Sequence, residues 1–184
     1  MKKLTLLIAT ILAIPCLSSA AEWKILSEKS KIEFRTMQNS TAILGSFKKF
    51  SGKINFDPTQ LKTSKVEIEI DTNSVEASLN DAAPTLKTPE WLSAKAFPKA
   101  TFIAEKFTKI SDKKFTADGS LTIKGKSVPT KLNFTLEEYS QTKAKVSGSV
   151  AIRRTDFMIG AKDPANSHGV QDEVAVSFVV NTTR

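Results

Sequence analysis

Sulfur chemistry is nearly missing from this chain. Cys16 is the only cysteine among the 184 residues, and it lies in an N-terminal apolar run. A single cysteine cannot form an internal disulfide, and structural metal sites usually draw on clusters of cysteine or histidine. The stability of the folded protein must therefore come from its core and its backbone hydrogen bonds.

Residues suited to catalysis are also scarce. The only histidine, His168, lies among Gly, Asn and Ser residues, where a lone histidine is usually solvated. Asp163 and Asp172 are potential partners but do not make a catalytic-triad pattern with it. Glu67 and Glu69 share the wet face of a predicted strand, whereas paired catalytic carboxylates flank a cleft. Since a phosphate-binding loop and a nucleophile elbow are also missing, we expect no enzyme, no metal site and no cofactor.

Like charges do not form a block, although the net charge is +8. The lysines are scattered over polar positions of the predicted strands, as at Lys53, Lys65 and Lys131, which is typical of a solvated outer surface. Because an aromatic-basic motif is missing, nucleic-acid binding is not expected. The alternative is weak attraction to anionic lipid headgroups, which leaves transient contact with a membrane surface open.

The longest apolar run, Leu4–Leu17, is short; it follows two lysines and precedes four small residues. This order is that of a secretory signal peptide. A retained membrane anchor is the weaker interpretation, because the run is shorter than the ~20 residues that cross a bilayer and contains Pro15. We therefore expect residues 1–21 to be a signal peptide cleaved after Ala20 or Ala21, and the mature protein to be periplasmic.

Alternation with a period of two dominates residues 22–184, which are expected to form one domain. In Lys65–Asp71, Val66, Ile68 and Ile70 share one face and charged residues the other. This pattern predicts strands with one dry and one wet face. Such strands are expected at Lys31–Thr36, Ala42–Asp57 (two short strands around Ser51-Gly52), Lys65–Asp71, Thr101–Ile110, Lys114–Lys124, Val128–Leu136, Lys143–Ile152 and Glu173–Asn181. About eight antiparallel strands favour an all-β barrel or sandwich, and closure into a barrel removes exposed edges.

Two stretches interrupt the alternation. Near residues 80–97 the sequence predicts a short helical excursion, in which Thr88 caps the helix and Pro89 takes its first position. Met158–Asp172 is a long polar loop, and loops of this length are commonly functional or disordered. Gly125 predicts a tight hairpin between the strands on either side of it.

Phenylalanine is by far the commonest aromatic residue, with 11 copies against one tyrosine and two tryptophans. Its side chain is large and wholly apolar, so most copies must pack in a core. The interior of an eight-stranded barrel is either just filled by its own side chains or able to hold one small ligand. Composition does not distinguish between these two outcomes.

Several short strings, in matching order and at matching separations, resemble the YceI-like family of bacterial exported proteins. They are Ser30–Phe34 (S-x-I-x-F), Gly45–Pro58 (G-x-F…F-x-G-x-I-x-F-D-P), Val66–Val75, Glu90–Phe102 (ending in F-P-x-A-x-F), Gly119–Pro129 (G-x-L-T-I-x-G…P) and Arg154–Gly160 (R-x-D-F-G-x-G). The resemblance extends from Trp23 to Val180. Two departures are Met158, where the family has glycine, and Asn80–Pro84, which replaces its R-D-x-H-L lead-in.

The resemblance implies a single antiparallel eight-stranded lipocalin-like barrel that binds a polyisoprenoid, such as an isoprenoid quinone or a polyprenyl lipid, or a similar amphiphilic lipid. The residues expected to line the barrel are Phe34, Val66, Ile68, Phe102, Phe134, Val150 and Phe178. At its mouth we expect Trp91, Leu92, Arg154 and Asp156. The last two residues would contact a polar head group, pin the mouth loop or form a structural ion pair.

The expected partner is thus a hydrophobic lipid held in the interior, and a homodimer is a further partner that the sequence leaves open. The competing hypothesis is a filled-core interaction module of the cell envelope that works on its outer surface, for example with a membrane redox protein. A lipid-modifying enzyme is a third hypothesis, which the lack of a catalytic cluster disfavours.

Overall fold

The structure is a computed structural model that describes residues 22–161 and 169–184. The predicted signal peptide and its cleavage position lie outside the described residues, and so do Asp163 and His168. In the part of the chain that is described, no helix combines the length and the apolarity needed to cross a membrane.

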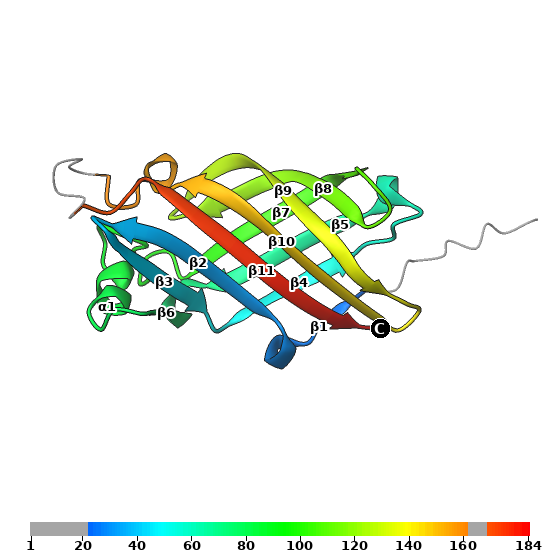
Figure 1. Cartoon of the computed structure of the whole chain (residues 1–184), viewed down its shortest axis with the longest axis horizontal. Helices are drawn as coiled ribbons and strands as arrows, with labels where there is room; N and C mark the ends of the chain where they lie inside the picture. Colours follow the sequence, from blue (N-terminus) through cyan, green and yellow to red (C-terminus); the bar gives the residue numbers. More distant parts are fainter. Residues whose placement is uncertain (1–21, 162–168) are drawn as a thin grey trace, which may run out of the picture.

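All strands belong to one antiparallel sheet (Figure 1). Within the described ranges they are β1 (Lys24–Ile25), β2 (Lys31–Gln38), β3 (Thr41–Phe47), β4 (Phe50–Asn55), β5 (Lys65–Asp71), β6 (Val75–Ala77), β7 (Lys99–Lys109), β8 (Lys114–Ile123), β9 (Lys126–Tyr139), β10 (Lys143–Arg153) and β11 (Glu173–Thr183). Their order is β4-β5-β7-β8-β9-β10-β11-β2-β3-β6, and β1 pairs with β11. The prediction of an all-β antiparallel fold is confirmed.

The predicted number of strands is wrong, because the described residues form an 11-stranded sheet and not eight strands. One extra strand is β6, which the 3₁₀ turn η3 (Thr72–Ser74) separates from β5. Another is β1, whose two residues are too few to produce a detectable alternation. The break between β3 and β4 falls at Lys48 and Lys49, where the chain bends, and not at Ser51-Gly52.

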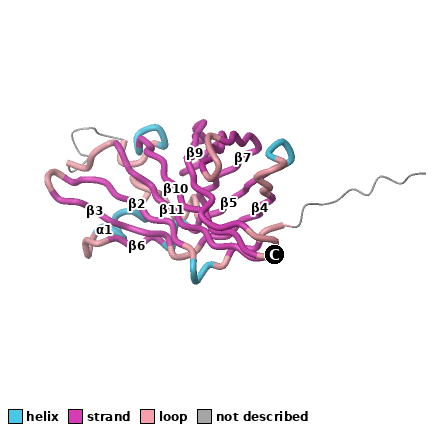
Figure 2. The backbone as a smooth tube through the Cα atoms, turned by 45° about the vertical axis from the view of Figure 1, so that its right-hand side comes forward, coloured by secondary structure: helices cyan, strands magenta, loops and turns pink. Residues whose placement is uncertain are grey.

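The sheet curls (Figure 2), with β2, β3 and β6 on one side of the molecule and β4, β5 and β7 on the other. Apolar side chains line the space inside the curl. The N-terminal segment connects two parts of the sheet that are far apart in the strand order. Trp23 N donates to Ile54 O of β4 at 2.8 Å, and the next two residues, in β1, pair with Thr183 and Thr182 of β11. This segment therefore forms a seam between the β4 edge and β11.

Alternation places polar and apolar side chains on opposite faces, as predicted. On the outer face, charged residues pair across neighbouring strands, as Lys65 does with Glu105 (2.6 Å) and Lys131 with Asp118 (3.3 Å). The hydrogen bond from Lys65 lowers the pKa of Glu105. Such exposed pairs contribute little to stability, but they keep the outer face charged and solvated.

The helical excursion is present, but its predicted start is wrong. The helix α1 spans Ala82–Lys87, and Thr88 is its C-cap residue: Thr88 N donates to Thr85 O at 3.0 Å. The reason is Pro89, which disfavours helical backbone at the residue before it, and Thr88 is extended with ψ 162°. Pro84 lies in the first helical turn, where a missing N–H costs no intrahelical bond.

The predicted hairpin between β8 and β9 is confirmed. Lys124 and Gly125 both have positive φ, at 51° and 73°. Two consecutive residues of this kind are typical of a type I′ turn, whose twist suits an antiparallel pair.

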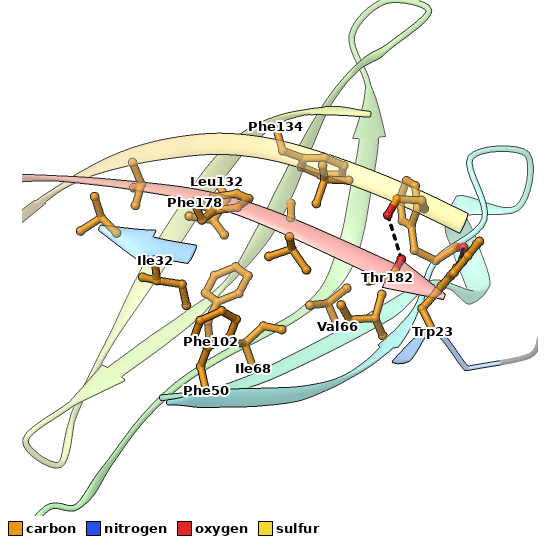
Figure 3. Close-up of a pocket in the computed structure, with 18 of the residues that line it drawn as sticks. Trp23, Ile32, Phe50, Val66, Ile68, Phe102, Leu132, Phe134, Phe178 and Thr182 are labelled. Carbon is orange, nitrogen blue, oxygen red and sulfur yellow. Dashed lines mark hydrogen bonds between the residues drawn. The ribbon is translucent and has the colours of Figure 1, made fainter. Parts of the chain in front are cut away.

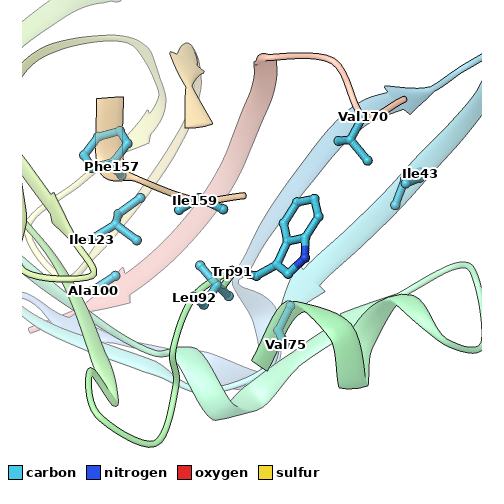
Figure 4. Packing of buried hydrophobic residues seen from close by; sticks show 9 residues of the cluster. All are labelled: Ile43, Val75, Trp91, Leu92, Ala100, Ile123, Phe157, Ile159 and Val170. Carbon is cyan, nitrogen blue, oxygen red and sulfur yellow. The ribbon is translucent and has the colours of Figure 1, made fainter. Parts of the chain in front are cut away.

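One end of the interior is filled by apolar side chains (Figure 4). We call these residues the Trp91 cluster: Ile43, Val75, Trp91, Leu92, Ala100, Ile123, Phe157, Ile159 and Val170. Each of them is exposed by 9% or less. They come from β3, β6, β7, β8 and three irregular segments, so this cluster joins the loops to the sheet.

Arg154 holds the loop segments over the Trp91 cluster. It is 6% exposed and begins η4 (Arg154–Phe157). Its guanidinium donates to the carbonyl oxygens of Ile159 (2.8 Å), Gly160 (3.0 Å), Val170 (3.1 Å) and Gln171 (3.2 Å). Its Cζ lies 5.8 Å from the centroid of the Trp91 ring. One side chain thus satisfies carbonyl groups from two separate segments of chain.

Trp23 anchors the seam at the other end of the molecule. Its side chain is 2% exposed, and its Nε1 donates to Phe56 O at 3.0 Å. The Arg184 guanidinium stacks over its ring, 3.9 Å from the centroid, and the Tyr139 ring lies 5.7 Å away. The side chain is therefore buried, covered by a guanidinium, in contact with a second aromatic ring and hydrogen-bonded at its edge.

We predict that Trp23→Ala lowers the free energy of unfolding by about 3–5 kcal/mol, because it removes a buried indole from the seam. Trp23→Phe should lower it by about 1–3 kcal/mol, because Phe56 O loses the shorter of its two hydrogen bonds and keeps only the one from Arg184 Nη2 at 3.5 Å. Urea unfolding followed by far-UV circular dichroism measures both. A Trp23→Ala protein within about 1 kcal/mol of the wild type would show that the seam is not needed.

For the buried arginine, we predict that Arg154→Lys lowers the free energy of unfolding by about 2–4 kcal/mol, because a lysine cannot reach all of these carbonyl oxygens. The matched control is Arg153→Lys, at the exposed neighbouring position, which should change stability little. The same urea titration compares the two proteins. Equal losses for both substitutions would contradict the assigned role of Arg154.

Candidate binding cavity

A cavity of about 170 Å³ lies inside the curled sheet, and none of the nine residues of the Trp91 cluster lines it. Six of the seven predicted lining residues surround it: Val66, Ile68, Phe102, Phe134, Val150 and Phe178. They come from β5, β7, β9, β10 and β11, and each occupies an inward position of its strand. Figure 3 shows Ile68 and Phe102 on one side of this space and Phe134 and Phe178 on the other. Alternation alone therefore brought together side chains that are distant in sequence.

The lining is almost wholly apolar. Its few polar groups lie at one end, where Figure 3 places Trp23 and Thr182 close together. Both are already used, since Thr182 Oγ1 donates to Ala144 O at 3.2 Å and the Trp23 indole donates to Phe56 O. Among the described residues, no buried side-chain nitrogen or oxygen lacks a hydrogen-bond partner. The cavity therefore offers a guest apolar contact and no free polar partner.

Four phenylalanine rings occupy part of the interior. Phe56 lies 5.5 Å from Phe107 and 5.6 Å from both Phe115 and Phe134, measured between ring centroids. Phe115 and Phe134 stack at 5.5 Å. These distances are those of favourable aromatic pairs. The two outcomes that composition left open thus coexist, since part of the interior is filled by phenyl rings and part is empty.

The empty part is small. A cavity of about 150 Å³ in another protein core stays dry and binds benzene. The present cavity, at about 170 Å³, therefore has room for a group of about that size without rearrangement. A longer chain needs the lining side chains to move, and the rings that border the cavity are the side chains closest to it.

Phe34 does not line the cavity, in contrast to the prediction. Its ring lies 5.8 Å from that of Phe47, and both pack against the Trp91 cluster. The face of the sheet was predicted correctly, because Phe34 does point inward. The period of two predicts which face of β2 carries Phe34, but not whether Phe34 lies beside the cavity or beside the Trp91 cluster. That depends on how the whole sheet curls.

The predicted mouth residues do not form an open mouth. Trp91 and Leu92 are each 7% exposed and lie within the Trp91 cluster, away from the cavity lining. Of the alternatives predicted for Arg154, the structure shows the one in which it holds the loop segments together. Asp156 is exposed. The ion pair between these two is not formed, because backbone carbonyl groups take the guanidinium of Arg154.

The ion pair of this loop joins Arg153 and Asp172, with Nε and Oδ2 2.8 Å apart. Asp172 also accepts hydrogen bonds from the backbone N–H and the hydroxyl of Thr155. Partial burial favours the protonated acid, but the hydrogen bonds from Arg153 and Thr155 outweigh it and lower the pKa of Asp172. The carboxylate therefore has a structural role in fixing the start of η4.

Several lining residues were missed at the sequence level. Ile54, in β4, and Phe56, just after it, line the cavity but were not among the predicted lining residues. Phe107 follows a β-bulge in β7, where the register shifts between Ala104 and Lys106 and the alternation changes phase. Trp23 lies in a segment too short for any periodicity, so no sequence signal could have assigned it.

The described residues contain no group of three or more His, Cys, Asp or Glu side chains placed to hold a metal ion. The acidic residues Glu67 and Glu69 lie on the outer side of β5, opposite the cavity-lining positions Val66 and Ile68. The arrangement is suited to enclosing an apolar group, and it places no reactive side chain beside that group.

Comparison with known proteins assigns the family. The chain matches the model of the YceI-like domain over residues 23–182. It is 30% identical over 184 aligned residues to a UPF0312 protein of Pectobacterium atrosepticum, covering 96% of this chain and 95% of that one.

Solved structures have the same fold. BcnA of Burkholderia cenocepacia superposes with a TM-score of 0.79 at 27% identity, covering 85% of this chain and 98% of that one. A polyisoprenoid-binding domain from Saccharophagus degradans superposes with a TM-score of 0.68 at 16% identity, covering 88% and 97%, which is a likeness of fold. Because the family model covers nearly all of the described residues, this protein belongs to the YceI-like family.

Proposed function

We propose that this protein is an exported, non-enzymatic binding protein that sequesters or carries a polyisoprenoid, such as an isoprenoid quinone or a polyprenyl lipid, or a similar amphiphilic lipid. The observation that carries the proposal is the cavity of about 170 Å³ with an apolar lining, and among the described residues no buried side-chain nitrogen or oxygen is left without a hydrogen-bond partner. Such a space favours a hydrocarbon chain over water, because water needs two or more hydrogen-bond partners.

Burial of the chain supplies the binding energy. Each isoprene unit has five carbons, so burying one contributes roughly 3–4 kcal/mol at about 0.8 kcal/mol per carbon. Ordering a flexible chain offsets much of this gain, and a few units are therefore enough for tight binding. A polar head group would lose its hydration inside this lining, so it stays outside or at the end near Thr182.

Kinship supports the ligand class. The structure from Saccharophagus degradans is that of a polyisoprenoid-binding domain, and its fold is the fold of this chain. Binding proteins of this kind enclose an insoluble molecule and need break no bond in it, which agrees with a lining that holds no acid, base or nucleophile.

The alternative is a filled-core module that acts through its outer surface, for example on a membrane redox protein. The four packed phenylalanine rings favour this alternative, because they fill part of the interior. We prefer carriage because the remaining space lies where the inward positions of eight strands meet, and a filled core would leave no such space.

Cellular location and partners belong to the same proposal. Residues 1–21 direct export, and the mature domain works in the periplasm. Loading requires transient contact with a membrane surface, for which Leu44 and Leu79, 51% and 37% exposed, are available apolar side chains near α1. A homodimer is the remaining proposed partner.

The direct test is native mass spectrometry of the protein purified without detergent. Carriage predicts a bound hydrophobic mass that organic extraction removes and added polyprenyl alcohol restores. A protein that is free of ligand and takes up no polyprenyl alcohol would favour the filled-core alternative.

For the site itself, we predict that Val150→Glu abolishes binding of polyprenyl alcohol, because it places a carboxylate in the apolar lining. The matched control is Ser149→Glu, the same change at the adjacent outward position of β10, which should bind as the wild type does. Native mass spectrometry measures occupancy, and far-UV circular dichroism verifies that both proteins are folded. Equal binding by the two variants would remove this cavity as the site.

A second substitution at the same position separates binding from stability. Val150→Phe adds apolar volume where there is empty space, so the protein should keep its stability or gain up to about 1 kcal/mol while losing the ligand. Retained binding with unchanged affinity would again place the ligand elsewhere.

A further inference from the structure

The inward face of the sheet contains glycines at positions where a strand would otherwise carry an apolar side chain. Gly52, Gly119 and Gly148 lie on β4, β8 and β10, and all three have ordinary negative-φ strand backbone. Glycine weakens a strand unless something close by requires the missing side chain. At each of these positions the space that a side chain would need is taken by a backbone carbonyl oxygen and by an inward side chain.

Each of these glycines lies under an inward side chain of an adjacent strand. A Cβ atom on Gly148 would stand closer than 3.0 Å to the Phe178 ring, which pairs with it across β10 and β11. A Cβ on Gly52 would be 2.6 Å from Ile68 Cδ1, and one on Gly119 would be 2.9 Å from Phe102 Cζ. Figure 3 shows Ile68, Phe102 and Phe178 around one space.

Because the three glycines have no side chain, the wall of the cavity is thinner at these three positions. Three cavity-lining side chains lie against the backbone of a glycine and do not extend across the lumen. They are Ile68, Phe102 and Phe178. The strands that contain Gly119 and Gly148 are paired on both sides, so the wall cannot move far outward there. Gly52 lies on β4, which pairs with β5 on one side and is bridged at Ile54 to Trp23 on the other. A side chain at the glycine position would therefore displace its neighbour toward the empty side, which is the cavity.

We propose that Gly52, Gly119 and Gly148 set the bore of the cavity and thereby decide the thickness of the chain that it admits. This inference rests on the proposed function and adds a specificity to it. A methyl-branched chain is thicker than a straight one of the same carbon number. The glycines let the lumen accept the methyl branches of an isoprenoid.

A fourth glycine provides a control within the same sheet. A Cβ on Gly45 would stand closer than 3.0 Å to the Phe34 ring, which pairs with it across β2 and β3. Backbone crowding is also matched, because the added Cβ would lie 2.6 Å from Glu76 O, and at Gly148 it would lie 2.5 Å from Asn133 O. Phe34, however, packs against the Trp91 cluster and does not line the cavity.

The experiment is a competition. Four proteins are each mixed with equimolar amounts of farnesol and the straight-chain alcohol of the same carbon number. They are the wild type, Gly148→Ala, Gly52→Ala and Gly45→Ala. Native mass spectrometry then measures the ratio of the two bound masses. A ratio taken on folded, loaded protein is insensitive to differences in stability among the variants.

We expect the farnesol ratio to fall about tenfold in Gly148→Ala and Gly52→Ala, since the lumen loses the width of a methyl group or more, and to stay within about twofold of wild type in Gly45→Ala. Adding Phe178→Leu to Gly148→Ala removes the displaced ring and should restore the ratio. An unchanged ratio in Gly148→Ala, or an equal fall in Gly45→Ala, would overturn the inference.

If Gly148→Ala does not fold, Phe178→Leu in the wild-type background tests the same point, because a smaller side chain over Gly148 widens the bore. The farnesol ratio should then rise, and an unchanged ratio would overturn the inference. A wild-type protein that takes up neither alcohol would instead contradict the proposed function, so the two failures are distinguishable.

Discussion

The structure depends on one constraint, which is that a single sheet must cover its own apolar face. An antiparallel sheet with alternating strands has one apolar face, and in the part of the chain that the structure describes no helical layer covers it. The sheet solves this by curling, and the short segment after Trp23 connects the β4 edge to β11. A seam of so few residues can hold these two parts of the sheet together because the Trp23 indole is buried, hydrogen-bonded and stacked beneath Arg184.

Curling alone does not fill the space that it encloses, and the two ends are closed by different means. At one end, loop segments after α1 and around η4 bring in the Trp91 cluster, and Arg154 supplies donors to the carbonyl groups of those loops. Toward the other end, the phenyl rings around Phe56 pack against one another. The cavity is what remains between these two packed regions, so its size is set by how far each extends inward.

This division explains why the interior is suited to binding an apolar group. Polar groups near the cavity are hydrogen-bonded within the protein, and the charged residues of the strands face solvent. In the function proposed above, a ligand is selected by its apolarity, its length and its thickness. The length that fits would depend on how readily the phenyl rings move, and the thickness on the wall, where Ile68, Phe102 and Phe178 lie against glycines.

The sequence by itself determined the fold class and the face of each long strand, because a period of two is a local property that each strand carries independently. That is why Val66, Ile68, Val150 and Phe178 could be placed in the lining without a structure. Only the tertiary structure decided where along each strand the cavity begins and ends. In the structure Phe34 and Trp91 lie at the filled end, and Arg154 donates hydrogen bonds to backbone carbonyl groups. Trp23 and Phe107, which were not predicted, line the cavity. The physical reason is that curl, bulges and loop packing are properties of the whole sheet, and no short window of residues encodes them.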